Sequence, residues 1–287
     1  MYKTIISSKN LKDIINDKNL IIFDCRYDLM EKDSGFKSYI ESHIKNAHYI
    51  NLELDLSSNI TKHSGRHPLP SILKFSSILN SFGVNSNSQI VVYDDENSSM
   101  CSRMWWMLKL VGIENCAVLD GGFQSWLASK LEVDSEIPLK VKQENIEYSY
   151  NNNYIVETEE LKILLEKKDI HLVDARDKDR FEGKIEPIDN KAGHIPGAIN
   201  LPFKNNLEKN GQFKKVSELK EIFNDLTKDT SKSIVNMCGS GVTACHNLLA
   251  MEHCGIKYSR IYVGSWSAWS SYDDTNINRG VTIENEN

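Results

Sequence analysis

The chemistry of this chain is expected first at the turn that contains Cys238. Ile234 and Val235, a few residues before Cys238, indicate the end of a buried strand, and apolar residues recur at helical spacing from Val242 on. Between strand and helix, Gly239 and Gly241 permit backbone geometry that other residues disfavour. Such a turn can direct successive N–H groups toward one point in front of the positive end of a helix, where a thiolate would be stabilised. We therefore predict that Cys238 is a nucleophile.

The other five cysteines are expected to be inert core residues, because free cysteine is among the most buried residue types. They are Cys25, Cys101, Cys116, Cys245 and Cys254. A zinc site formed by Cys238, Cys245, His246 and Cys254 is disfavoured, because these residues lack the paired short spacings of structural zinc motifs.

Composition and charge exclude several classes of function. The 287 residues are 40% apolar and 26% charged, as in a globular protein, and suffice for two domains. A net charge of −6 disfavours binding to nucleic acid or to an anionic membrane. No apolar run approaches the ~20 residues that span a bilayer. Six cysteines without a secretory signal indicate a reducing compartment. We expect a cytoplasmic protein, with the mitochondrion as the alternative, and neither nucleic acid nor membrane as a partner.

An internal repeat predicts two copies of one domain. Ile21–Arg26 returns as His171–Arg176, Ser42–Ala47 as Gly193–Ala198, and Asp120–Trp126 as Val263–Trp269, at offsets of 150, 151 and 143 residues. Each copy alternates short apolar strands with amphipathic helices, which predicts an α/β fold with a parallel sheet flanked by helices. We expect domains at 1–136 and 155–287, joined by a linker at 137–154 within a polar, irregular stretch that begins at Val133. A polar tail from Asp273 is expected to be loosely held.

Periodicity also places the main elements. In the first copy it predicts strands near Ile21–Phe23, Ile90–Tyr93 and Ala117–Leu119, and helices near Leu11–Asn16, Leu73–Phe82 and Ser102–Val111. In the second copy it predicts strands at His171–Val173, Ser233–Val235 and Arg260–Tyr262.

The loop from Cys238 to Cys245 (CGSGVTAC) resembles the active-site loop of 3-mercaptopyruvate sulfurtransferases, in the two-domain rhodanese family. The related thiosulfate sulfurtransferases carry basic residues where this chain has Gly239 and Ser240. The resemblance extends over nearly the whole chain and implies two tandem rhodanese-like domains. Because Asp94 stands opposite Cys238 in the first copy and a carboxylate cannot carry sulfur, that domain is expected to be catalytically silent. The resemblance implies no metal and no organic cofactor.

The resemblance also implies residues that bind a small anionic sulfur donor. Arg180 matches the family arginine that holds the anionic group of the donor, whereas Arg176 matches a position that is more often structural. Many of these enzymes carry a second arginine after a Glu-Pro pair, which is absent after Pro187. Lys184 or Lys191 could replace it as a point charge. The loop positions counted with the substrate-binding residues are Gly239, Gly241, Val242 and Thr243.

A proton relay is implied by two segments of the first copy. The segment Arg66–Pro70 resembles the one that bears a catalytic histidine, here His67, and Asn51–Glu53 resembles the one that bears its acidic partner, here Glu53 with Asp55 as a rival. With Ser240 these residues would form a Ser–His–acid relay that contacts the donor. We interpret His43 and His194, which each begin a His-Ile turn, as structural residues. The same holds for the paired tryptophans Trp105 and Trp106, and Trp266 and Trp269.

These residues favour a sulfurtransferase that works in two steps. Cys238 would take sulfur from 3-mercaptopyruvate and pass it from a persulfide to a thiol such as thioredoxin or glutathione, or to cyanide. The neutral Gly239 and Ser240 favour this donor over dianionic thiosulfate, which stays the alternative. A cysteine phosphatase is excluded because Ala244 stands where the phosphate-binding arginine is needed. A persulfide carrier or thiol-redox binding module, loaded by another protein, is the alternative that is not an enzyme.

Overall fold

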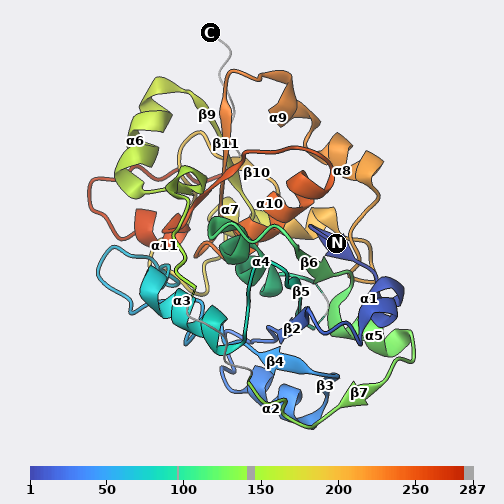
Figure 1. Ribbon diagram of the computed structural model, residues 1–287. Helices are drawn as coiled ribbons and strands as arrows, with labels where there is room; N and C mark the ends of the chain where they lie inside the picture. Colours follow the sequence, from blue (N-terminus) through green and yellow to red (C-terminus); the bar gives the residue numbers. More distant parts are fainter. Residues whose placement is uncertain (96, 141–145, 281–287) are drawn as a thin grey trace. The chain divides into compact units, whose positions relative to one another are not determined.

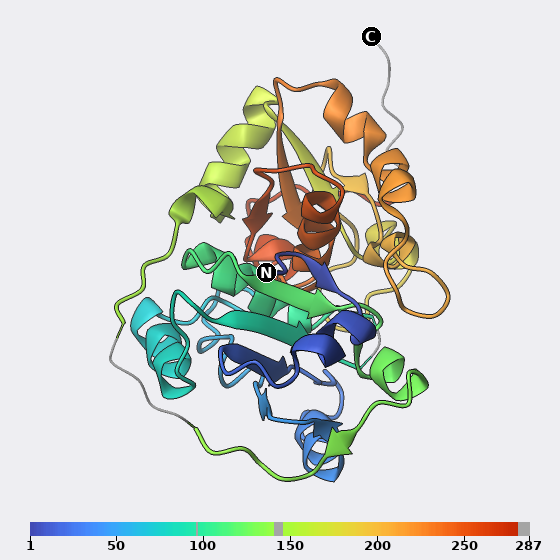
Figure 2. The same cartoon turned by 45° about the vertical axis from the view of Figure 1, so that its right-hand side comes forward.

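The computed structural model describes residues 1–95, 97–140 and 146–280, and the chain divides into two compact units (Figures 1 and 2). The first unit comprises Met1–Ser58, Leu69–Asn151 and Leu207–Lys214, and the second comprises Asn59–Pro68, Asn152–Asn206 and the chain from Lys215 on. Two short segments therefore depart from the contiguous domains expected at 1–136 and 155–287. Within the described part of the chain, no helix has the length and apolar character that crossing a membrane requires.

The first unit contains a five-stranded parallel sheet with the order β1-β6-β5-β2-β4. Its strands are β1 (Ile5–Ile6), β2 (Leu20–Asp24), β4 (Ala47–Tyr49), β5 (Gln89–Tyr93) and β6 (Cys116–Leu119). Its helices are α1 (Ser8–Ile14), α2 (Ser34–Glu41), α3 (Ile72–Ser81), α4 (Cys101–Leu110) and α5 (Gly122–Ala128). In the stretch expected to be irregular, β7 (Val133–Asp134) pairs antiparallel with β3 (His43–Ile44). Residues 141–145 of the expected linker lie outside the described residues.

The second unit contains a parallel sheet with the order β10-β9-β11-β12-β8. Its strands are β8 (Ile155–Val156), β9 (Ile170–Asp174), β10 (Ile199–Asn200), β11 (Ser233–Met237) and β12 (Arg260–Tyr262). Its α-helices are α6 (Thr158–Lys167), α7 (Lys178–Phe181), α8 (Val216–Ile222), α9 (Asn224–Lys228), α10 (Thr243–His253) and α11 (Ser265–Trp269), and its 3₁₀ turns are η1 (Asn152–Tyr154) and η2 (Phe203–Asn206).

The two sheets share one topology. When the strands are paired by the sequence repeat, β1, β6, β5, β2 and β4 correspond in order to β8, β12, β11, β9 and β10. The central strands consist largely of branched and aromatic residues that are buried on both faces, as is typical of parallel sheets. The predicted architecture, two copies of one α/β domain each with a parallel sheet flanked by helices, is confirmed.

Two local predictions need correction. Helix α1 begins at Ser8 rather than near Leu11, because the Ser7 hydroxyl accepts a hydrogen bond from the Asn10 N–H (3.2 Å) and caps the helix. The tail from Asp273 is not loose up to Gly280. The main chain of Asn278 pairs with that of His194 (2.9 and 3.0 Å), and the Gly280 N–H donates to Glu182 O (2.9 Å). Polar side chains misled the prediction because these hydrogen bonds belong to the backbone. Residues 281–287 lie outside the described residues.

A buried ion pair follows the corresponding strands β2 and β9. In the first unit Arg26 Nη2 donates to Asp24 Oδ2, and in the second Arg176 Nη2 donates to Asp174 Oδ2, both at 2.7 Å. The same guanidinium nitrogens also reach a backbone carbonyl, that of Ser42 (2.6 Å) in the first unit and its counterpart in the second. The guanidinium of Arg176 is therefore held by partners within its own unit.

We expect the substitution Asp24→Ala to lower the free energy of unfolding of the first unit by about 3–5 kcal/mol, because it leaves the buried Arg26 charge without its counter-ion. Urea denaturation monitored by fluorescence would measure the change. Glu114→Ala, which removes the exposed partner of Lys109, serves as the control and should change the free energy by less than about 1 kcal/mol. Similar losses for the two variants would contradict the structural role of the buried pair.

Candidate active site

Cys238 lies in the turn between β11 and α10, at the carboxyl end of a strand of the second sheet. Both elements are labelled in Figure 1. Strand β11 ends at Met237, so Cys238 is the first residue beyond the sheet. Its N–H donates to Ser265 Oγ (3.1 Å) and its carbonyl accepts from the Trp266 N–H (3.0 Å), which fixes the backbone from both sides. The residue is 1% exposed. A rigid, buried setting of this kind positions a nucleophile and keeps bulk water away from it.

Gly241 shapes the turn around the sulfur. Its N–H donates to Cys238 Sγ (3.1 Å), and its carbonyl accepts from Cys245 Sγ (3.3 Å). Its φ is +74°, and a Cβ at this position would lie 2.6 Å from Val263 O. Both the left-handed backbone and the close packing therefore require glycine. Val242 and Thr243 follow at the amino end of α10, where the helix dipole is positive.

His67 and Ser240 are hydrogen-bonded in the second unit, with His67 Nδ1 2.7 Å from Ser240 Oγ. Both side chains are buried. The segment Asn59–Pro68 belongs to this unit because the Arg66 N–H donates to Ser267 Oγ (3.1 Å) and because His63 stacks on the ring of Tyr272. The structure thus brings together two of the three residues of the predicted relay.

Glu53, the third predicted member, lies in the first unit. Its carboxylate accepts from Lys32 Nζ (2.8 Å) near the surface. Its rival Asp55 accepts from the N–H of Asn51 (2.8 Å), and burial raises the pKa of the Asp55 carboxyl. The role of Glu53 stays a prediction.

Arg180 lies in a row of alternating charges that starts from the buried pair of Arg176. Glu186 Oε1 accepts from Arg180 Nη2 (2.7 Å), and Glu186 Oε2 lies 3.5 Å from Arg176 Nη1. Burial alone would raise the pKa of the Glu186 carboxyl, but the hydrogen bonds from Arg180 and from the Asp189 N–H lower it overall. Asp189 continues the row, because its carboxylate contacts both Arg180 and Arg66. All five side chains belong to the second unit.

Arg66 was absent from the predicted site, although it directly precedes His67 in the sequence. A Cβ built on Gly239 would lie 2.9 Å from Arg66 Nη2 and 3.4 Å from Arg180 Nη1, so both guanidinium groups pack against the residue that follows Cys238. The position of Arg66 directly before His67 was the sequence feature that could have indicated its place in the site.

The two lysines considered as replacements for a second arginine have other partners. Lys184 Nζ pairs with the carboxylates of Glu182 and Asp179, and Lys191 Nζ donates to the carbonyl of Tyr272 (3.0 Å). The structure therefore places the guanidinium of Arg66, rather than either ammonium group, next to Arg180.

The corresponding loop of the first unit contains a carboxylate. Asp94 accepts hydrogen bonds from the N–H groups of Ser98 (2.9 Å), Met100 (2.8 Å) and Cys101 (3.3 Å). Burial raises the pKa of the Asp94 carboxyl to about 6 in spite of these bonds. The loop after β5 is thus also an anion-binding turn, and the anion it holds is its own side chain.

The remaining cysteines and histidines have structural surroundings. All six cysteines are buried and free of disulfides, and burial raises the pKa of Cys25 and of Cys101. His43 Nδ1 and His194 Nδ1 lie 2.7 and 2.8 Å from backbone carbonyls, and each ring stacks on an aromatic side chain. Among the residues that the structure describes, no three His, Cys, Asp or Glu side chains are grouped to hold a metal ion.

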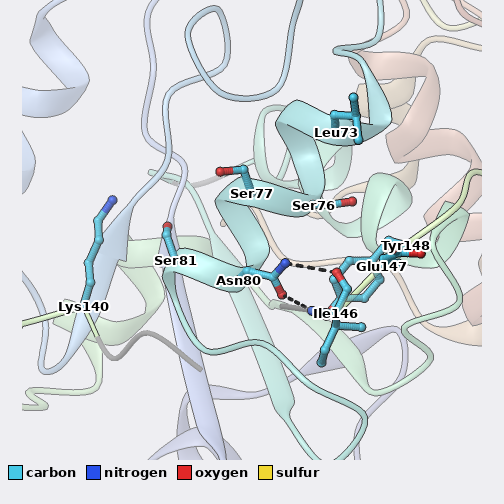
Figure 3. A pocket seen from close by; sticks show the side chains of 9 residues that line it. All are labelled: Leu73, Ser76, Ser77, Asn80, Ser81, Lys140, Ile146, Glu147 and Tyr148. Carbon is cyan, nitrogen blue, oxygen red and sulfur yellow. Dashed lines mark hydrogen bonds between the residues drawn. The ribbon is translucent and has the colours of Figure 1, made fainter. Parts of the chain in front are cut away.

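A cavity of about 890 Å³ in the first unit lies between α3 and the segment Ile146–Tyr148 (Figure 3). The Asn80 side chain bridges the two, because it donates to Ile146 O (3.0 Å) and accepts from Ile146 N–H (3.1 Å). The lining contains serine hydroxyls, but neither cysteine nor histidine is among the described lining residues. We assign no chemistry to it.

Comparison with known proteins gives consistent results over most of the chain. Residues 7–129 and 157–272 match the rhodanese-like domain family. The chain is 35% identical over 268 residues to a probable 3-mercaptopyruvate sulfurtransferase of Pseudomonas aeruginosa, covering 92% of this chain and 94% of that one. It is 32% identical over 278 residues to a thiosulfate sulfurtransferase of Rattus norvegicus, covering 94% and 92%. The crystal structure of SseA from Escherichia coli, described as a 3-mercaptopyruvate sulfotransferase, superposes with a TM-score of 0.80 at 27% identity, covering 93% of this chain and 100% of that one.

We expect Gly241→Ala to destabilise the second unit by about 2–4 kcal/mol, because a left-handed backbone conformation is strained for alanine and the new Cβ would meet Val263 O. Gly255→Ala is the matched control. Gly255 also has a positive φ, of +96°, but nothing lies within 4 Å of its added Cβ, so its substitution should cost about 1 kcal/mol. Urea unfolding of the two variants measures the difference. Equal costs would show that the contact with Val263 is unimportant.

Proposed function

The chain belongs to the rhodanese-like domain family and is a sulfurtransferase, and from that premise we propose that it transfers sulfur from 3-mercaptopyruvate through a persulfide on Cys238. The observation that carries this proposal is the buried sulfur of Cys238, which accepts a hydrogen bond from the Gly241 N–H in front of α10. Ser240, in the same loop, is hydrogen-bonded to His67. This setting stabilises a thiolate and supplies a hydroxyl for proton transfer.

The proposed reaction has two steps. The thiolate of Cys238 attacks the sulfur of the donor, so that an S–S bond forms and the C–S bond breaks. The electron pair of that bond leaves on carbon as the enolate of pyruvate, which then takes up a proton. In the second step an acceptor thiolate, such as that of thioredoxin or glutathione, or cyanide takes the outer sulfur and regenerates the Cys238 thiolate. These steps require neither a metal nor an organic cofactor.

The charges beside the sulfur favour a donor with a single negative charge. The guanidinium groups of Arg66 and Arg180 are balanced by the carboxylates of Glu186 and Asp189. The residues after Cys238 in the loop, Gly239 to Thr243, are uncharged. A dianion such as thiosulfate would meet little net positive charge there, and it would be bound less well than a monoanion.

Ser240 is proposed to protonate the leaving enolate, with His67 as its hydrogen-bonded partner (2.7 Å). Hydroxyl and imidazole act as one unit, because the proton that serine gives up is replaced through the histidine.

Cys238→Ser should abolish sulfur transfer, because an alkoxide cannot carry the transferable sulfur. Intact-mass measurement after exposure to 3-mercaptopyruvate should show one added sulfur in the wild-type protein, removable by thiols, and none in the variant. Asp94→Asn is the control and should retain turnover within about tenfold, or 1.4 kcal/mol in the barrier. Sulfur that still adds to the Cys238→Ser protein would show that another cysteine is the carrier. Loading without repeated turnover in the wild type would support the persulfide carrier instead.

Ser240→Ala and His67→Ala should each slow turnover of 3-mercaptopyruvate by about 10²–10³-fold, the usual contribution of general acid catalysis. Turnover of thiosulfate should fall much less, because sulfite leaves as a stable anion that needs no proton. The double variant should be scarcely slower than either single one, since the two groups act together. Steady-state kcat/KM with the same acceptor measures these effects. Equal losses for both donors would contradict the relay.

A further inference from the structure

One carboxylate of the second unit is shared by two guanidinium groups. Arg66 Nη1 forms an ion pair with Asp189 Oδ1, and Arg180 Nη2 lies 3.4 Å from Asp189 Oδ2. The Asp189 side chain is 6% exposed, whereas those of Arg66 and Arg180 are 23% and 16% exposed. The two arginines therefore form a site that already holds a carboxylate, and this carboxylate is part of the chain itself.

This pair of arginines lies beside the reacting residue. Gly239 is bonded to Cys238, and a Cβ on Gly239 would lie 2.9 Å from Arg66 Nη2 and 3.4 Å from Arg180 Nη1. A larger residue at this position would have to push the ends of the two arginine side chains aside. Two contacts beside this pair do not involve Asp189. The Arg180 guanidinium donates to the Glu186 carboxylate (2.7 Å), and the backbone N–H of Arg66 donates to Ser267 Oγ (3.1 Å) and so holds the segment that carries this arginine.

Resting on the proposed function, we infer that Arg66 and Arg180 together bind the carboxylate of the donor, and that Asp189 is an internal carboxylate which the donor must displace. Guanidinium groups suit planar carboxylates because their N–H groups form two parallel charge-assisted hydrogen bonds. Two guanidinium groups that are largely buried need a counter-charge when no donor is bound, and Asp189 supplies it. The affinity for the donor is then reduced by the fraction of molecules in which Asp189 occupies the site.

The first test removes the guanidinium of Arg66. Arg66→Ala should raise KM for 3-mercaptopyruvate about 10- to 100-fold, as expected for the loss of a charge-assisted contact, and lower kcat less. With 1-mercapto-2-propanone, which has a methyl group in place of the carboxylate, kcat/KM of the variant should stay within about twofold of the low wild-type value. Arg66→Lys keeps the positive charge but loses the planar guanidinium that forms two parallel hydrogen bonds, so its KM should be intermediate. This variant tests the inference even if Arg66→Ala does not fold.

The matched control is Lys184→Ala, which removes a cation, partnered by Glu182 and Asp179, from the loop that carries Glu186 and Asp189. Its KM for 3-mercaptopyruvate should stay within about twofold of the wild-type value, because surface ion pairs contribute little. Equal effects of Arg66→Ala on both donors, or an effect of Lys184→Ala as large as that of Arg66→Ala, would overturn the inference.

The second test removes the charge of Asp189 while keeping its shape. Asp189→Asn should lower KM for 3-mercaptopyruvate, and the inhibition constant of pyruvate, by about three- to tenfold, because the donor no longer competes with an internal carboxylate. An unchanged or raised KM would show that Asp189 organises the arginines rather than competing with the donor, and would overturn this part of the inference.

Titration calorimetry with pyruvate separates this inference from the proposed function. Wild-type protein that binds pyruvate through Arg66 but does not turn over 3-mercaptopyruvate would contradict the proposed function and support the carboxylate site. Wild-type protein that turns over 3-mercaptopyruvate, together with an Arg66→Ala variant that binds pyruvate equally well, would contradict the inference alone.

Discussion

The functional side chains of the second unit depend on the buried ion pair between Arg176 and Asp174. A guanidinium group with almost no solvent contact must have a counter-charge within hydrogen-bonding distance, because its desolvation is otherwise too costly. Asp174 ends β9 and is aligned with Met237, the last residue of β11, from which Cys238 follows. The second partner of Arg176 is Glu186, and Glu186 in turn holds Arg180. The position of Arg180, the arginine proposed to bind the donor, is thus a consequence of a charge balance that begins in the core.

The two units show how one scaffold can carry different chemistry. The sheet topology and the Asp–Arg pair occur in both units. In both, the loop that follows the central strand directs backbone N–H groups at one side chain, three of them at Asp94 in the first unit and that of Gly241 at Cys238 Sγ in the second. In the first unit that side chain is a carboxylate, which is unable to exchange sulfur. In the second unit the loop is tightened by Gly241 and holds a thiol. The difference between the units lies in a few loop residues, whereas the cores that support the loops are shared.

The site of the second unit is electrically balanced before any donor arrives. The row Asp174, Arg176, Glu186, Arg180, Asp189 and Arg66 alternates in sign. Such an arrangement offsets the desolvation penalty of several largely buried charges and holds the arginines in a defined geometry. Under the inferred displacement of Asp189, an anionic donor exchanges with an internal group rather than entering an unneutralised positive site. Selectivity for a carboxylate then follows from geometry, because both oxygens of Asp189 contact guanidinium groups.

The sequence by itself determined the duplicated parallel sheets and the place of Cys238, because strand and helix periodicity and the glycines of the turn are local properties of the chain. It also placed His67 and Ser240 in one site, through the resemblance of their segments to a known family. Only the tertiary structure decided that the segment Asn59–Pro68 belongs to the second unit and that Arg66, 123 positions away in the chain, is the partner of Asp189. Residue type shows that a buried arginine needs a carboxylate, but many carboxylates are available in this chain. Which one it contacts is set by the packing of distant loops, and local patterns carry no information about that packing.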